Sequence, residues 1–270
     1  MQLHELMNPE YTDNPFPLYR KLHRQGPLIP AGDKIIISGS HAVVEALLND
    51  RRVGKNYMES VRLRFGDAAA DMPLFQGISR MFLVLNPPDH NRLRGLVMKA
   101  FSAREIKPLR EMALSVAHDL VDALAGHRDC DLAQAFAFPL PVRIICGMLD
   151  LAESDAPELG RLTFVPEKVF DQNISQSELL EAADAIVVLE RVFSAMIVAW
   201  RDSTACVQDY HLLCSASDTT RPTDGTHIEN VHLLSLAALL TTSNMLCNTL
   251  LALHDHPQEL ACLKQNHALI

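Results

Sequence analysis

Residues 85–102 read LNPPDHNRLRGLVMKAFS, and this stretch says more about the fold than any other. Asn86 suits a helix N-cap, Pro87 the first helical position and Asp89 the positive end of the helix dipole. Apolar side chains then recur at helical spacing, at Leu93, Leu96, Val97, Ala100 and Phe101. The stretch predicts a helix that begins at Pro87 and buries one face.

Two polar side chains share that face. His90 and Arg94 are four residues apart, so they lie along the apolar stripe and we expect them to face inward. Because an unpaired buried charge is costly, both need a partner. The partner is either an anionic ligand held at this helix, or an internal carboxylate paired with Arg94 beside a core histidine. The pattern alone favours the internal pair.

The same string is similar to a helix signature of bacterial cytochromes P450, D-P-P-[ED]-H-x-x-x-R, whose His and Arg bind the haem propionates. His90 and Arg94 match those positions, and Asn86 replaces the usual Asp, a change that concerns capping. The segments NPFPLYRKLHRQGP and DLAQAFAFPLPVRIICGMLDL also resemble family segments, in the expected order. The resemblance implies haem b as cofactor and a monooxygenase that oxidises an apolar small molecule with dioxygen.

A second motif, LAALLTT at residues 236–242, is similar to the family's [AG]-G-x-[DE]-T-T. In the family this motif lies on a long helix over the distal face of the haem. Ala237 and Ala238 match the small residues, and Thr241 matches the threonine that hands on protons. Leu240 replaces the acid and carries no proton. The alternative for Thr241 is a hydroxyl bonded to a carbonyl one turn earlier.

The helix that carries this motif is predicted from a capping box, Thr226 and Glu229, to about His254. It would be about 40 Å long and apolar on most faces, so we expect it to run through the middle of the domain. Residues 231–253 contain no Lys, Arg, Asp or Glu, which is long enough to span a bilayer. Interior polar residues and the lack of basic flanks favour a buried helix of a soluble, cytoplasmic protein.

A basic face follows His90. The resemblance implies that it docks a ferredoxin-type electron donor, the alternative being an ordinary solvated face. The formal net charge of −9 argues against a nucleic-acid partner. The basic residues of this face are Arg92, Arg94, Lys99, Arg104, Lys107 and Arg110.

The family's iron ligand is a cysteine in an F-x-x-G-x-H-x-C-x-G loop, preceded by a Glu-x-x-Arg pair. The chain has no such loop, and so no Glu-x-x-Arg pair ahead of one. Cys130 follows a Gly-His pair at the wrong spacing, so we interpret it as structural. We therefore expect no metal ligand, and a single incomplete domain over residues 1–270 that is inactive alone. The alternative is a non-catalytic, partner-stabilising relative of these enzymes, or the product of a decayed gene.

The expected fold class is mostly α with a small β component, a cytochrome P450-like fold that ends after the long central helix and the helix that follows it, the family's I and J helices. The periodicity predicts a strand at 33–38 and a loop with at most short helices at 54–80. Helices are predicted at 17–25, 41–49, 102–126, 139–149 and 178–200.

Overall fold

A computed structural model describes residues 5, 8–11, 14–32, 34–100, 103–126, 129–149, 151–170, 174–202 and 224–266. Only the backbone is described at 9, 96, 99, 100, 103–108, 197, 199–202 and 224–227. The sequence also predicts a linker rich in Ser, Thr and Asp at 215–225, and it lies almost wholly outside these residues. The chain divides into two compact units, Met1–Asn56 with Phe170–Ser175, and Tyr57–Val169 with Gln176–Ile270.

The first unit holds helices α2 (Phe16–Gln25) and α3 (His41–Asn49) and a two-stranded antiparallel sheet. Strands β1 (Ile29–Pro30) and β2 (Ile36–Ile37) pair Ile29 with Ile37. The predicted strand at 33–38 is thus only two residues long. Pro30 explains the short ladder, because it has no N–H to donate and stands at the end of the pairing.

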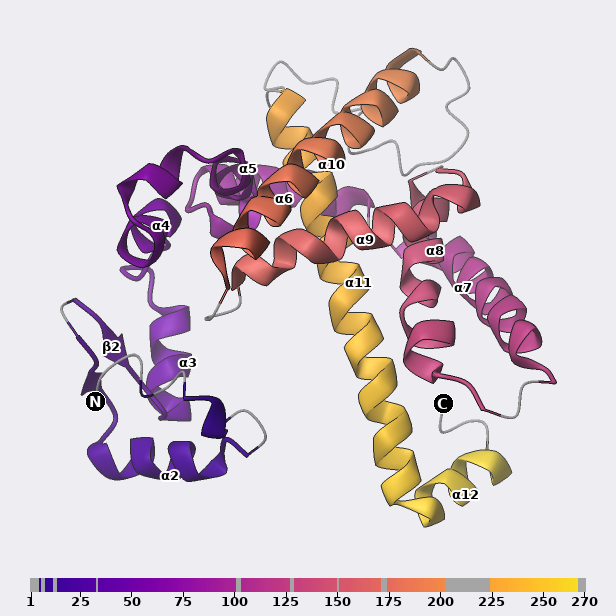
Figure 1. The fold of residues 1–270 in the computed structure, drawn as a ribbon, viewed down its shortest axis with the longest axis horizontal. Coiled ribbons are helices and arrows are strands. Elements are labelled where there is room, and N and C mark those ends of the chain that lie inside the picture. The colour runs from indigo at the N-terminus through magenta and orange to yellow at the C-terminus, as the bar shows by residue number, and fades with distance from the viewer. Residues whose placement is uncertain are drawn as a thin grey trace. The chain divides into compact units, whose positions relative to one another are not determined.

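The second unit is helical and begins with α4 (Tyr57–Phe65) and α5 (Pro73–Arg80), so residues 54–80 hold more helix than predicted. The remaining helices of this unit follow one another in chain order (Figure 1). The bounds are η2 (Asp67–Asp71), η3 (Phe82–Val84), α6 (Asp89–Ala100), α7 (Ala103–Leu124), η4 (Ala133–Ala137), α8 (Pro139–Met148), η5 (Glu153–Asp155), α9 (Ala156–Glu167), η6 (Lys168–Phe170), α10 (Gln176–Asp202), α11 (Asp224–Asp255) and α12 (Pro257–Gln265).

Helix α10 shows why these segments are helices that pack. Its buried residues recur every three or four positions, which puts them on one face of an α-helix. That face packs on α9, α5 and α11. The buried residues are Leu179, Ala182, Ala185, Ile186, Leu189, Phe193 and Met196.

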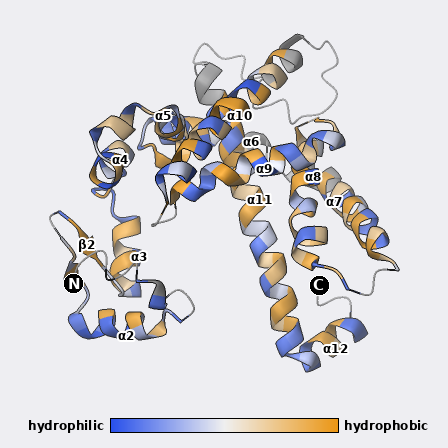
Figure 2. Cartoon of the chain, viewed as in Figure 1, coloured by the Kyte–Doolittle hydropathy of each residue, from blue (hydrophilic) through white to orange (hydrophobic). Residues whose placement is uncertain are grey.

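Helix α11 has two unlike halves. Helix α11 contacts α5, α8, α9, α10 and η4, and its buried side chains, Val231 and Leu239 among them, all lie between Glu229 and Ser243. After Ser243 none of its described side chains is buried, and apolar Met245 and Leu251 are exposed. Figure 2 shows apolar colour along this second half. The prediction of a helix covered along its length is therefore wrong for residues 244–255, because the buried side chains all lie in the first half.

By length and composition, residues Ile228–Asp255 of α11 would also suffice to cross a membrane. The buried side chains of its first half include the polar Glu229, His232 and Ser235. Buried polar groups that contact other helices are typical of a packed protein core.

Candidate haem-propionate site

Helix α6 begins later than predicted. Its first residue is Asp89, and the preceding Pro87–Pro88 peptide, which is cis, forms a turn. The predicted start at Pro87 is wrong, because a proline at 88 disfavours the helical conformation of the residue before it. The amide of His90 still donates to the carbonyl of Asn86, over 3.0 Å, so the chain enters the helix through one hydrogen-bonded turn.

His90 is half-buried at the start of this helix. Its Nδ1 lies 2.9 Å from the carbonyl oxygen of Phe82, and the two rings meet edge to face with their centroids 6.0 Å apart. A carbonyl oxygen only accepts, so Nδ1 carries a proton and donates it. The bond therefore fixes the orientation of the imidazole and leaves Nε2, on the other side of the ring, for a second partner.

Arg94 is exposed, so the prediction that it faces inward is wrong. At about 100° per residue, Arg94 stands roughly 80° from the direction midway between the buried Leu93 and Val97, and His90 only about 40° from it. Among the described residues no carboxylate pairs with Arg94, so the internal ion pair has no partner in this part of the chain.

The small residues of the second motif lie on an uncovered face of α11. Ala237 and Thr241 are exposed and Ala238 is half-buried. The Thr241 hydroxyl donates to the carbonyl oxygen of Ala237 over 2.6 Å, the local bond that the alternative interpretation foresees. Small side chains on an exposed helix face leave room for a flat, apolar group to lie against the helix.

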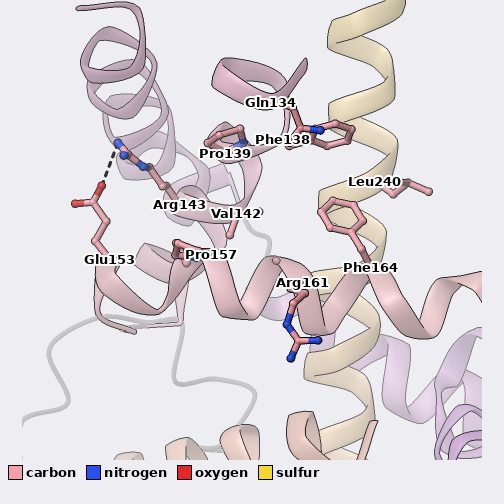
Figure 3. A pocket seen from close by; sticks show the side chains of 12 residues that line it. Gln134, Phe138, Pro139, Val142, Arg143, Glu153, Pro157, Arg161, Phe164 and Leu240 are labelled. Carbon is pink, nitrogen blue, oxygen red and sulfur yellow. Dashed lines mark ion pairs between the residues drawn. The ribbon is translucent and has the colours of Figure 1, made fainter. Parts of the chain in front are cut away.

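Leu240 lines a cavity of about 650 Å³ between α8, α9 and η4 (Figure 3). It stands beside the ring of Phe164, and the Arg143–Glu153 ion pair, 3.1 Å long, lies at the far side. The leucine in the acid position is therefore part of an apolar wall. The lining residues are Gln134, Phe138, Pro139, Val142, Arg143, Glu153, Ala156, Pro157, Gly160, Arg161, Phe164 and Leu240.

A polar cluster joins α5, α10 and α11, and it consists of the half-buried Arg80 and Glu190 and the buried Glu229 and His232. Arg80 Nη2 lies 2.6 Å from Glu229 Oε1 and 3.2 Å from Glu190 Oε1. His232 Nδ1 lies 4.0 Å from Glu229 Oε2. Sequence reasoning did not find this cluster, because its acid and its arginine are 149 residues apart.

Burial shifts the pKa values of two groups of the cluster, Glu229 and His232. It raises the pKa of Glu229 to about 7, and the hydrogen bond to Glu190 adds to this rise while Arg80 opposes it. Burial also lowers the pKa of His232 to about 4, so this histidine is neutral. The prediction that Glu229 serves a capping box is wrong, since its carboxylate binds Arg80 instead.

The predicted basic face is described only in part. Arg92 pairs with Asp89 at 3.3 Å, and Arg110 is exposed on α7. The side chains of Lys99, Arg104 and Lys107 lie outside the described residues.

The described cysteines offer no clustered ligand set. Cys130 is exposed, and Cys146 is buried, which raises the pKa of its thiol to about 11 and disfavours the thiolate. Among the residues described, no three His, Cys, Asp or Glu side chains come together as a metal site.

The mostly helical unit with a long central helix is the fold that the resemblance to haem-binding monooxygenases predicts. Comparison with known proteins agrees. The chain is 44% identical, over its full length, to a cytochrome P450 133B2 of Xylella fastidiosa (strain Temecula1 / ATCC 700964), of which it covers 68%. The chain belongs to the cytochrome P450 family. No protein-family model matches it.

Two further relatives extend the comparison. The cytochrome P450 monooxygenase PikC of Streptomyces venezuelae is 28% identical over 98% of the chain and 62% of its own length. The crystal structure of P450BioI with an acyl carrier protein carrying hexadec-9Z-enoic acid superposes with a TM-score of 0.83 at 24% identity. That match covers 95% of the chain and 66% of P450BioI. The fold class predicted from the sequence is thereby confirmed, and the chain spans about two-thirds of the length of these relatives.

Proposed function

We propose that these residues form the propionate-binding and distal part of a haem-dependent monooxygenase that oxidises an apolar small molecule. The observation that carries the proposal is His90, oriented by Phe82 and followed one turn later by an Arg94 that pairs with no described carboxylate. Two cationic donors spaced four apart suit two carboxylates of one ligand. When bound, haem b would supply the iron at which dioxygen is activated.

The residues present fit that group. Arg94 and Nε2 of His90 would hold the propionates, and the open face at Ala237, Ala238 and Thr241 would lie against the ring. Among the described residues, no side chain covers Arg94, Ala237 or Thr241, which are all exposed. We further place the protein in the cytoplasm, with α11 as a core helix, because its Glu229 pairs with Arg80 of α5.

Proton supply in this proposal falls to Thr241 and solvent. Leu240 is part of an apolar wall and moves no proton. The Thr241 hydroxyl donates to Ala237 and keeps its lone pairs for accepting a proton from water on the exposed face. Thr241 is therefore the candidate residue that would take up a proton from water and hand it on at the open face of α11.

The electron donor is proposed to be of the ferredoxin type, drawn to the basic face by charge. Its members with described side chains are Arg92, Arg94 and Arg110, and all are exposed. The apolar substrate class is supported by the hexadecenoic acyl group bound to P450BioI. By analogy with the family, loop residues 54–84 and the region 164–170 are the candidates to shape its pocket.

A second candidate function is a non-catalytic, partner-stabilising role. It is favoured by Leu240, which packs beside Phe164 where catalytic relatives carry an acid. The exposed apolar side chains after Ser243 would then contact a partner protein.

Haemin titration of the 270-residue chain tests the proposal. We expect saturable binding, weakened about tenfold to a hundredfold in Arg94→Ala because a charged hydrogen bond is lost. Arg110→Ala, an exposed arginine on α7, is the matched control and should bind as the wild type does. Equal binding by Arg94→Ala and wild type would remove Arg94 from the site, and absent saturation would favour the second candidate.

A carbon monoxide spectrum tests the ligand of the iron. With the haem-loaded chain reduced, we expect no red-shifted Soret band of cysteine-ligated iron, because the family's cysteine loop is not among these residues. The appearance of that band would show that one of the six cysteines coordinates the iron.

A further inference from the structure

The backbone of Phe82 is held from two sides. Its N–H donates to Asn230 Oδ1 of α11 over 3.0 Å. Its carbonyl oxygen accepts from His90 Nδ1 over 2.9 Å. One residue of η3 therefore connects the beginning of α11 to the beginning of α6.

The α11 end of this connection is firmly placed. Asn230 is only 5% exposed, and Met81, which precedes Phe82, is 1% exposed. The neighbouring residue of α11, Glu229, binds Arg80 at 2.6 Å. Two consecutive residues of α11 thus bind Arg80 and Phe82, which leaves the segment between α5 and α6 little freedom to turn.

The His90 end has a chemical consequence. Because the carbonyl of Phe82 only accepts, the bond selects the imidazole form with a proton on Nδ1. If Phe82 turned, its carbonyl would leave the ring and the imidazole could rotate, so that Nε2, which must carry a proton of its own to donate to a carboxylate, would no longer point to a fixed place. The setting of Phe82 therefore decides which nitrogen His90 presents to a ligand.

We infer that Asn230 is a positioning residue for His90, acting through the backbone of Phe82. This inference rests on the proposed function, in which Nε2 of His90 binds a propionate. Asn230 Oδ1 accepts the hydrogen bond from the Phe82 N–H. It fixes the peptide that orients the imidazole, as outer groups orient the histidines of metal sites.

Nitrogen-15 NMR of histidine-labelled 270-residue chain tests the inference without haem. In the wild type, His90 should show the Nδ1-protonated form, and Asn230→Ala should lose that signature. Asn230→Asp keeps an acceptor oxygen at the same place and should retain it. Ser235→Ala is the matched control, since it removes a buried hydroxyl of α11 that bonds only to Val231 of its own helix.

Each outcome decides between positioning and a merely structural role. A folded Asn230→Ala with the wild-type His90 spectrum overturns the inference, as does loss of the signature in Ser235→Ala. Should Asn230→Ala fail to fold, hydrogen exchange of the wild type replaces it. The Phe82 amide must then exchange slowly, and rapid exchange there overturns the inference.

Haemin affinity separates this inference from the proposed function. Asn230→Ala should bind haemin about threefold to tenfold more weakly, with Asn230→Asp close to wild type, because one neutral hydrogen bond is lost. If the wild type does not bind haemin, the proposed function fails while the NMR result stands. If Asn230→Ala loses the NMR signature yet binds haemin as the wild type does, the positioning role is overturned.

Discussion

The two halves of α11 have similar hydropathy and opposite surroundings. In the first half Leu239 is fully buried and Glu229 is 1% exposed, whereas in the second half Leu251 is 62% exposed. Helix α11 contacts α5, α8, α9, α10 and η4, and α9 and α10 cross it in its first half (Figure 1). Composition therefore does not decide burial along this helix, and contact with other segments does.

The largest expected effect comes from truncating one leucine in each half. Leu239→Ala should lower the free energy of unfolding by about 2–5 kcal/mol, because it leaves a cavity in a packed site. Leu251→Ala should change it by less than about 0.5 kcal/mol. Urea unfolding of both variants measures the difference. Equal costs would mean that the second half of α11 is also covered in solution.

A glycine of α5 gives the next test of the buried half. A Cβ at Gly77 would lie 2.8 Å from Glu229 Oε1, and that carboxylate is held by Arg80. Gly77→Ala should therefore cost about 1–3 kcal/mol through overpacking. Gly147→Ala is the matched control in α8.

The control meets a softer neighbour. A Cβ at Gly147 would approach the sulfur of Met112, the end of a flexible side chain that can move aside. Gly147→Ala should be neutral or stabilising, because alanine favours the helix by about 0.5–1 kcal/mol. Thermal unfolding of the pair measures this, and equal losses of stability would refute the tight fit at Gly77.

The buried half should also respond to pH in two opposite ways. Burial raises the pKa of Glu229 from 4.5 to about 7, so its contribution to stability is full below pH 4.5 and lost as the pH rises through 7. Burial lowers the pKa of His232 from 6.5 to about 4, so its contribution is present above pH 6.5 and lost as the pH falls through 4.

Two variants separate these contributions. Relative to the wild type, Glu229→Gln should gain about 1–3 kcal/mol of unfolding free energy between pH 4.5 and 7, and His232→Gln a similar amount between pH 6.5 and 4. Denaturant unfolding at several pH values measures both. Arg80 and Glu190 also face Glu229. If the unfolding free energies of both variants followed the wild-type pH dependence, these charged partners would offset the effect of burial on the pKa values.

The smallest expected effect is at Thr241. Its hydroxyl bonds to a carbonyl of the same helix and its side chain is exposed, so Thr241→Val should change stability by less than about 0.5 kcal/mol. Thermal unfolding checks this. A larger loss would show that Thr241 has a structural partner, and that its proposed role in proton transfer cannot be tested by this variant.

The sequence predicts local features well. The bounds of α3, His41–Asn49, agree with the predicted helix, because its apolar spacing and the turn after it are local signals. The prediction that Arg94 faces inward is wrong, because the i, i+4 rule does not resolve an offset of about 80° from the buried stripe. Whether Arg94 binds haem stays a prediction.

The features that the sequence does not predict depend on distant segments. Glu229 fits a capping pattern locally, and only the fold brings Arg80 beside it. Likewise, Leu239 and Leu251 have the same chemistry, and only the placement of α5, α8, α9 and α10 distinguishes them. No signal within a few residues of either leucine carries that information.

The bond between Phe82 and Asn230 also sets an order of assembly. The two residues are 148 positions apart in the chain. At about 5–20 residues per second, a ribosome releases Phe82 about 7–30 s before Asn230 is made. His90 therefore leaves the ribosome early but acquires its fixed setting late, when the start of α11 arrives. The site is thus completed only once Asn230, the last of these residues to be synthesised, has been made.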